Sequence, residues 1–163
     1  MQTADFEELI LAAILHDPMN IRVVASELGA DKFSATSRKM IYEAMLELYI
    51  QRIPIDIPNL LQALGPIKAE KVGNEAYALS LRSKFQQLGV ESDRGLENWA
   101  RVVDTAGRLR LVSQIMEKFQ RPFEDFERLV GEVEDVDGFV ADMVGQIQSA
   151  MGGRNSHYST ARE

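Results

Sequence analysis

The amino-acid sequence predicts an all-α protein, in which a compact bundle of short helices precedes a long helical hairpin. Apolar residues recur at every third or fourth position over most of the chain, which is the pattern of helices with one buried face. Helix-ending pairs such as Asp17-Pro18 and Gly65-Pro66 divide the first half into short segments. In the second half one apolar stripe continues for about six turns. We therefore expect a globular head over 1–90, a hairpin over 96–151 and a linker over 152–163.

The first helix is expected to begin at Asp5, which forms a capping-box pattern with Glu8, and to end at Asp17-Pro18. Its buried face would consist of Phe6, Leu9, Ile10, Ala13 and Ile14. His16 lies in its last turn, where an imidazole interacts favourably with free carbonyl groups. A second short helix is expected from Asn20 to Leu28, with Gly29 as its C-terminal stop.

Three more short helices complete the predicted head. The third helix begins after Thr36 or Ser37, and its buried face consists of Ile41, Ala44, Met45 and Leu48. Asp56 follows an extended segment and caps the fourth helix, which has Pro58 in its first turn and ends at Gly65-Pro66. The fifth helix covers about residues 74–86, and the side chains expected to turn inward are Ala76, Leu79 and Phe85.

The second half of the chain carries two apolar stripes, which predict an antiparallel helical hairpin. The first stripe runs along a helix from Leu96 to Phe119, and Pro122 is expected to interrupt this helix. An acidic segment over 124–137 separates it from a last helix that ends near Met151. We interpret the following residues as the seam of the hairpin or of its dimer: Trp99, Val103, Leu109, Val112, Met116, Val140, Val144 and Ile147. Because a hairpin alone cannot bury both an inner seam and outer apolar residues, we expect it to bind a partner.

The last residues predict a connection to a further domain. Gly152-Gly153 and the polar residues after them are typical of a flexible linker. Thr160 and Glu163 form a second capping-box pattern, which would open another helix. A helix start at this position indicates that the natural polypeptide continues beyond Glu163.

Composition and missing motifs argue against several functions. The chain has no cysteine and two histidines, which excludes disulfides and thiolate or histidine-rich metal sites, and we expect no cofactor. It lacks the phosphate-binding loop and the usual hydrolase motifs, so we expect no enzymatic activity. No signal peptide or membrane span is recognisable, which favours the cytoplasm. The net charge of -7 repels phosphate groups, so DNA contact by this domain is expected to be weak or absent.

An alternative is a DNA-binding regulator with a helix-turn-helix motif over 21–49. Ala25 and Gly29 fit the small residue and the glycine of such a motif. Ala35 and Arg38, however, fall where the second helix of the motif should be apolar. This mismatch places the DNA-binding hypothesis behind an interaction domain.

Several segments, taken in order, resemble the N-terminal domain of DnaB-type bacterial or phage replicative DNA helicases. They are 8–18 (ELILAAILHDP), 37–49 (SRKMIYEAMLELY), 54–60 (PIDIPNL), 73–77 (GNEAY) and 99–103 (WARVV). The resemblance extends over about residues 6–150 and is strongest over 37–60. Two regions depart from the family pattern: 84–96 lacks its proline-containing turn, and 120–137 is longer and more acidic than its hairpin tip.

The resemblance implies a non-catalytic collar domain, whose hairpins pair and whose dimers assemble in threes above a hexameric motor. Primase and a helicase loader are the implied partners, and the full-length protein would be an ATP-dependent helicase involved in DNA replication. Candidate docking residues on the outside of the hairpin are Arg108, Arg110, Glu117 and Lys118. A second hypothesis is a free-standing phage-type adaptor that binds a host helicase or primase.

Overall fold

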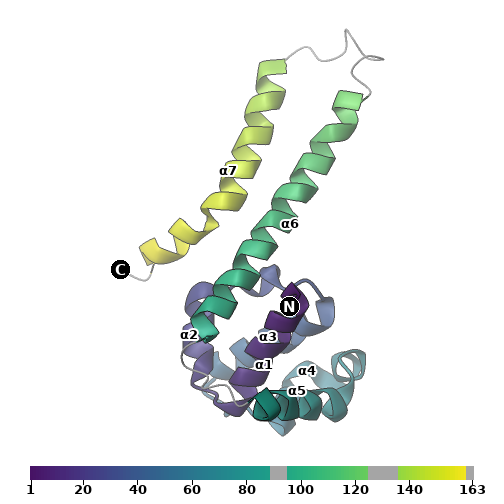
Figure 1. Ribbon diagram of the computed structural model, residues 1–163, viewed down its shortest axis with the longest axis vertical. Helices are drawn as coiled ribbons and strands as arrows, with labels where there is room; N and C mark the ends of the chain where they lie inside the picture. Colours follow the sequence, from purple (N-terminus) through teal and green to yellow (C-terminus); the bar gives the residue numbers. More distant parts are fainter. Residues whose placement is uncertain (89–94, 125–135, 161–163) are drawn as a thin grey trace. The chain divides into compact units, whose positions relative to one another are not determined.

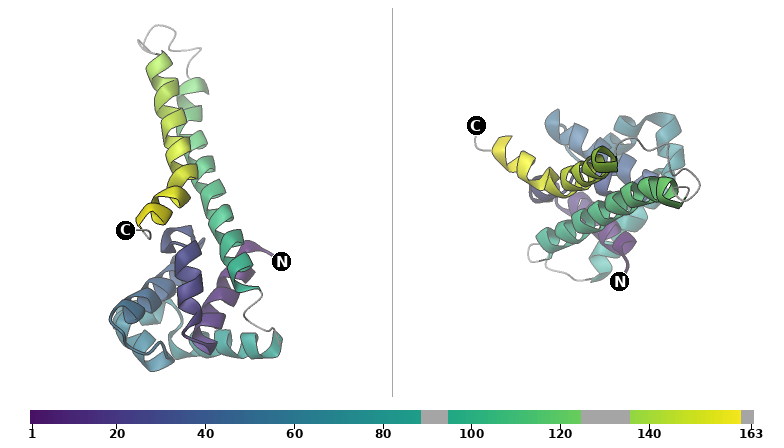
Figure 2. Two further views of the ribbon diagram at one scale, coloured as in Figure 1. Left: turned by 90° about the vertical axis from the view of Figure 1, so that its left-hand side faces the viewer. Right: turned by 90° about the horizontal axis from the view of Figure 1, so that it is seen from above.

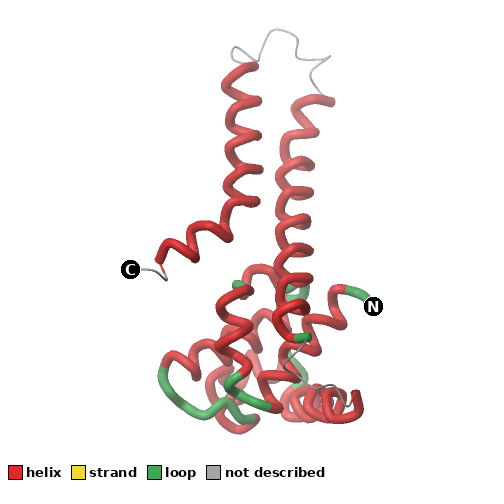
Figure 3. The backbone as a smooth tube through the Cα atoms, turned by 60° about the vertical axis from the view of Figure 1, so that its left-hand side comes forward, coloured by secondary structure: helices red, strands yellow, loops and turns green. Residues whose placement is uncertain are grey.

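The structure is a computed structural model, and it describes residues 1–88, 95–124 and 136–160. In these ranges the chain is helical and contains no strand, as Figure 3 shows, so the predicted all-α fold is confirmed. The elements in chain order are α1 (Thr3–His16), α2 (Asn20–Glu27), the short 3-10 helix η1 (Ala30–Lys32), α3 (Thr36–Ile50), α4 (Ile57–Lys71), α5 (Asn74–Leu88), α6 (Leu96–Glu124) and α7 (Val136–Thr160). They form two compact units, the head unit (Met1–Gly107) and the hairpin unit (Arg108–Glu163).

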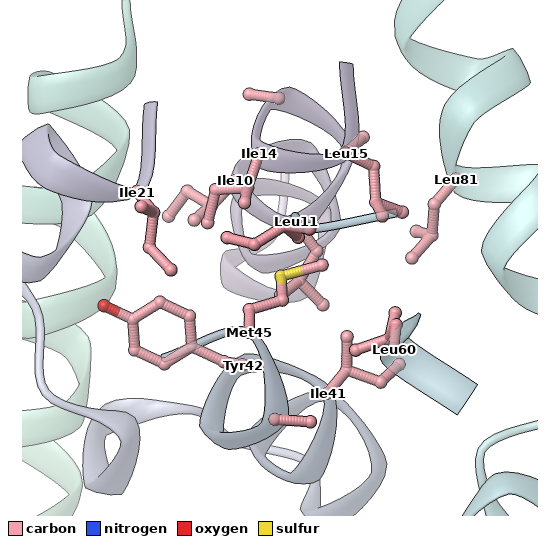
Figure 4. Packing of buried hydrophobic residues seen from close by; sticks show 14 of the residues in the cluster. Ile10, Leu11, Ile14, Leu15, Ile21, Ile41, Tyr42, Met45, Leu60 and Leu81 are labelled. Carbon is pink, nitrogen blue, oxygen red and sulfur yellow. The ribbon is translucent and has the colours of Figure 1, made fainter. Parts of the chain in front are cut away.

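Helix α1 is the central helix of the head unit and is buried on all sides. Residues 9–15 are each at most 9% exposed, which is a wider buried surface than the single face predicted from their spacing. Helices α2, α3 and α5 pack around it. Figure 4 shows Met45 of α3 pointing towards Leu11 of α1, with Tyr42 beside it. A helix that is apolar all round must be covered all round, so α1 requires each of these neighbours.

Polar side chains close both ends of α1. Its N-cap is Gln2 and not Asp5, so the predicted start is three residues too late. Asp5 instead stands in the first turn, where its carboxylate accepts a hydrogen bond from the backbone N–H of Gln2 at 2.7 Å. At the other end, the buried Asn20 donates its Nδ2 to the carbonyl of Ala13 at 3.0 Å. The backbone groups at both ends are thereby satisfied next to an apolar core.

The second turn of α1 carries a fully buried carboxylate, Glu7. It accepts hydrogen bonds from the backbone N–H of Ser34 at 2.7 Å, from Ser34 Oγ at 3.0 Å and from Arg38 Nε at 2.5 Å. Desolvation alone would lower the pKa of Arg38, but the hydrogen bond and the charge of Glu7 outweigh it and raise this pKa. A buried carboxylate is tolerated when its lone pairs are satisfied, so this cluster ties α1 to α3 and to the turn before it.

Two further hydrogen-bonding features position α3. The buried Tyr42 donates its hydroxyl to the carbonyl of Leu28 at 2.9 Å, which joins α3 to the end of α2. Burial raises the pKa of Tyr42, so the hydroxyl keeps its proton as a donor. The C-terminus of α3 closes with a bond of 2.9 Å from the N–H of Ile53 to the carbonyl of Leu48. Arg52 occupies the left-handed position of this turn, with φ at 58°, where glycine is usual.

Helix α4 begins as predicted and consists of two helical segments that meet at a kink. Asp56 is its N-cap, and Asp56 Oδ1 accepts a hydrogen bond from the N–H of Asn59 at 2.8 Å. Gly65 has φ at 74° and interrupts the helical geometry there. The chain turns helical again at Pro66, because proline suits the first turn of a helix, and continues to Lys71. Gly65 therefore ends the first helical segment of α4, as the sequence predicts, and a second segment follows it across a kink.

The covered face of α5 differs from the prediction. Its buried residues are Ala78, Leu81 and Phe85. The inward position of Phe85 is confirmed, and its ring lies 5.0 Å from the ring of His16. Ala76 and Leu79 were wrongly assigned to the core, since both are exposed. Both sets of residues have helical spacing, and spacing alone does not tell which stripe is covered.

The first part of α6 belongs to the head unit. Leu96, Ala100 and Val103 form one face with spacings of four and three, and each is at most 2% exposed. Gly107 continues this face. A Cβ atom at Gly107 would lie 2.9 Å from the Cα atom of Lys32, so α6 approaches η1 at a distance that only glycine permits. The boundary between the two units consequently falls inside α6, whereas the sequence analysis placed it before residue 96.

Both long helices extend beyond their predicted ends. Helix α6 continues for two residues after Pro122, which lies in its last turn, where a lost hydrogen bond disturbs little of the helix. Helix α7 continues through Gly152 and Gly153 to Thr160, where the sequence predicts a linker. Residues 125–135 and 161–163, which contain most of the acidic segment and of the last capping-box pattern, lie outside the described ranges.

The substitution Glu7→Gln is expected to lower the free energy of unfolding of the head unit by about 2–4 kcal/mol, because Arg38 loses the charged partner of a buried pair. Urea denaturation followed by circular dichroism measures this change. The matched control is Glu8→Gln, since Glu8 pairs with the exposed Lys84 and such pairs contribute about 0–1 kcal/mol. Equal losses in the two variants would contradict the special importance of the buried cluster.

Candidate interaction surface of the hairpin unit

In the hairpin unit, α6 and α7 lie side by side in antiparallel directions (Figures 1 and 2). Two contacts fix their register. The rings of Phe119 and Phe139 lie 5.1 Å apart at an interplanar angle of 72°. Arg108 Nη1 donates a hydrogen bond to the carbonyl of Met151 at 3.1 Å. Eleven residues along α6 thus correspond to twelve residues back along α7, as expected for two helices with the same rise per residue.

This register, together with burial, identifies the inner seam of the hairpin. On α6 the seam positions are spaced by four, three and four residues: Arg108, Val112, Ile115 and Phe119. On α7 they are Phe139, Met143, Gln146, Ile147 and Ala150. All of them are buried or half-buried. The inner seam is therefore filled by residues of the same chain.

Leu111 apart, which is 37% exposed, the large apolar side chains exposed in the described part of the hairpin unit number five, and each comes directly after a seam position. They are Leu109, Met116, Val140, Val144 and Met151, and we call them the open face. Leu109 is 63% exposed and Met116 is 58% exposed. The three residues of α7 are between 38% and 55% exposed. Contiguous apolar surface of this kind on a water-facing helix pair is typical of a protein interaction site.

The residues of the open face lie on the same side of the hairpin. One step along any right-handed helix turns the side-chain direction by about 100° in the same sense. When two antiparallel helices face each other, this turn carries the side chains of both helices towards one side of the pair. Leu109 and Met116 of α6 therefore lie on the same side as Val140 and Val144 of α7. Together they form one surface across two helices.

The residues predicted as a seam fall into three groups. Trp99 is half-buried and Val103 fully buried, and both belong to the core of the head unit. Val112 and Ile147 are half-buried at the inner seam. The other four belong to the open face: Leu109, Met116, Val140 and Val144. Seam residues that the sequence analysis did not select are Ile115, Phe139, Met143 and Ala150, although the last three share the spacing of the selected stripe on α7.

The four charged docking candidates occupy different positions. Arg108 lies in the inner seam and is bonded to Met151, so its guanidinium group is engaged within the chain. Lys118 Nζ lies 5.6 Å from the ring centre of the phenylalanine that follows it. Arg110 and Glu117 are seven residues apart, or about two turns, so they share one line of α6, on the side turned away from α7. This line is separate from the open face.

The DNA-binding hypothesis assigns α3 as the reading helix. In the structure five of its side chains are buried in the core of the head unit: Ile41, Tyr42, Ala44, Met45 and Leu48. Arg38 is bonded to Glu7, and Lys39 Nζ lies 3.8 Å from Glu43 Oε1. The two cations in the first turn of α3 are thus paired with carboxylates, which reduces their attraction for phosphate groups.

Two other kinds of site find no support in the described part of the chain. Within 1–88, 95–124 and 136–160, no three side chains of His, Asp or Glu gather as metal ligands would. No helix in the same ranges combines the length and the apolar character that a membrane crossing requires. The open face is therefore the feature of the described residues that points most directly to binding.

Comparison with known proteins identifies similar domains. Residues 1–104 match the model of the family described as DnaB-like helicase N terminal domain. The structure is similar to the crystal structure of the N-terminal domain of DnaB helicase from Mycobacterium tuberculosis, with a TM-score of 0.73 and 20% sequence identity. This likeness covers 88% of the chain and 94% of the mycobacterial one, and at such identity it indicates a shared fold. No curated protein sequence matches the chain.

The substitution Phe119→Ala is expected to destabilise the hairpin unit by about 3 kcal/mol, because Phe119 is 5% exposed and packs edge-on against Phe139. The matched control Met116→Ala removes an exposed side chain one turn earlier and should cost less than about 1 kcal/mol. Hydrogen exchange of the α7 amides, at a concentration where the chain is monomeric, measures both effects. Similar losses of protection in the two variants would contradict the register.

Proposed function

Because this chain belongs to the family of DnaB-like helicase N-terminal domains, we propose that it is a collar and docking domain of a hexameric replicative helicase. The family match covers residues 1–104, which is more than half of the 163 residues. The domain associates with further copies of itself, and it binds primase or a helicase loader. Its action is mechanical and allosteric, because association sets the geometry of the ring and partner binding biases that geometry. The motor domain of the same helicase would carry out ATP-dependent strand separation. The helicase would act in the cytoplasm.

The open face is the observation that carries the proposal of self-association. The inner seam is already filled, so the hairpin has no use for a second apolar stripe within its own chain. A second hairpin supplies a matching surface, and two hairpins that meet on these faces make a four-helix bundle. A two-fold axis would place the same five residues on both sides of the contact, which suits a surface built from self-complementary aliphatic and thioether groups.

Charging the open face tests this assignment. Val144→Glu and Leu109→Glu are each expected to raise the dissociation constant of self-association at least about 100-fold, because a carboxylate would be buried in an apolar contact. Analytical ultracentrifugation measures the constant, and circular dichroism reports whether the helices persist.

The matched controls are Ser149→Glu on α7 and Gln114→Glu on α6, since both positions are exposed and lie away from the open face. These variants should associate as the unmodified chain does. If the open-face variants keep the unmodified oligomer mass, or if the unmodified chain is monomeric at every concentration, self-association through this surface is rejected.

Partner docking is assigned to the charged line of α6 that contains Arg110 and Glu117. Because this line is separate from the open face, the charge reversal Glu117→Lys should weaken binding of primase or loader about tenfold or more and leave self-association unchanged. Titration calorimetry with each purified partner measures the affinity. Arg22→Glu, an exposed reversal on α2 of the head unit, is the control. Unchanged binding of both partners by Glu117→Lys would remove this line as the docking surface.

A further inference from the structure

The hairpin unit contains a polar contact next to a weak point of α7. Arg108 Nη1 of α6 donates a hydrogen bond to the main-chain carbonyl of Met151 at 3.1 Å. Gly152 and Gly153 come next in the sequence, yet α7 remains helical to Thr160. The contact joins residues 43 positions apart, and it marks the place where the paired part of α7 ends.

The segment 152–160 has little intrinsic tendency to be helical. Its sequence is GGRNSHYST, and eight of these nine residues rank in the middle or lower part of the helix-propensity scale, with glycine near the bottom. Gly152 has no atom of a neighbouring segment within 4 Å of the place where a Cβ would stand. The helix gains no packing on that side of Gly152, so the backbone hydrogen bonds contribute most of what holds it helical at this point.

Arg108 is placed to serve as a cap if α7 stops at Met151. A helix that ends leaves its last carbonyl groups without intrahelical donors, and a cation near them is favourable. Arg108 already donates to one of these carbonyls from the neighbouring helix. If the turns after Met151 unwound, Arg108 would therefore still donate a hydrogen bond to the new C-terminus of α7.

We propose that Arg108 and the Gly152-Gly153 pair form a helix–coil switch at the end of the hairpin. In one state α7 continues as a helix to Thr160. In the other state 152–160 unwinds while Arg108 holds α7 closed up to Met151, so the connection becomes compliant and the inner seam stays shut. This inference concerns the segment that follows the hairpin, and it does not depend on self-association through the open face.

Hydrogen exchange of the full chain tests the switch directly. The amides of 153–160 are expected to exchange at least about tenfold faster than those of 140–150, because local unwinding exposes the former group alone. The double substitution Gly152→Ala with Gly153→Ala should slow exchange in 153–160 about tenfold or more and leave 140–150 unchanged. Equal protection of the two segments in the unmodified chain, or no response to the double substitution, would overturn the proposal.

The role of Arg108 needs its own variants. Arg108→Gln should raise exchange at 147–151 several-fold and leave the seam around Phe139 protected, whereas Arg108→Lys, which keeps a cationic donor, should lie between. Gln114→Ala, at an exposed position of the same helix, is the control. Sedimentation in the same buffer checks that all variants have the same oligomeric state. No change at 147–151, or a loss of protection throughout α7, would reject a local cap.

Discussion

The complete burial of α1 is the constraint that organises the head unit. Residues 9–15 are apolar on every side of the helix, so α2, α3 and α5 must each supply a covering face at the same time. The polar groups at the ends of this helix make the arrangement specific. Glu7 is satisfied by Ser34 and Arg38, and Asn20 satisfies a carbonyl of the last turn. The apolar contacts supply the stability, and these bonds select one arrangement of the neighbours.

Most helices of the head could be predicted from the sequence, since apolar spacing and caps are local signals. The cap at Asp56 and the inward Phe85 illustrate this. The predictions fail where the burial or pairing of a residue depends on a segment that is distant in the sequence. Leu79 has the right spacing for a core position, but the neighbouring helices cover Ala78 and Leu81 instead. The buried pair of Glu7 with Arg38 joins residues 31 positions apart, and a single sequence gives no signal of that separation.

The sequence predicts the apolar residues of the candidate site but does not tell which of them lie inside the hairpin and which face outwards, and the reason is physical. Helix α7 carries two adjacent apolar stripes with the same spacing, one containing Phe139 and Met143 and the other Val140 and Val144. Periodicity detects both stripes but does not tell which of them faces α6. A helix pair that must hold itself together and also meet a partner needs both. The stripe that contains Val140 and Val144 is therefore the surface that suits a binding role.

The central position of α1 also governs how the chain can fold during synthesis. Its most extensive contacts are with α5, which begins about seventy residues later in the sequence. While the ribosome has released only α1 to α4, one side of α1 is without its cover, and apolar surface stays accessible to other chains or to chaperones. Pairing of the first helix with the fifth then covers this side, and the first turns of α6 complete the core. The head is thus acquired as a cooperative block once α5 and the start of α6 have emerged, and not helix by helix.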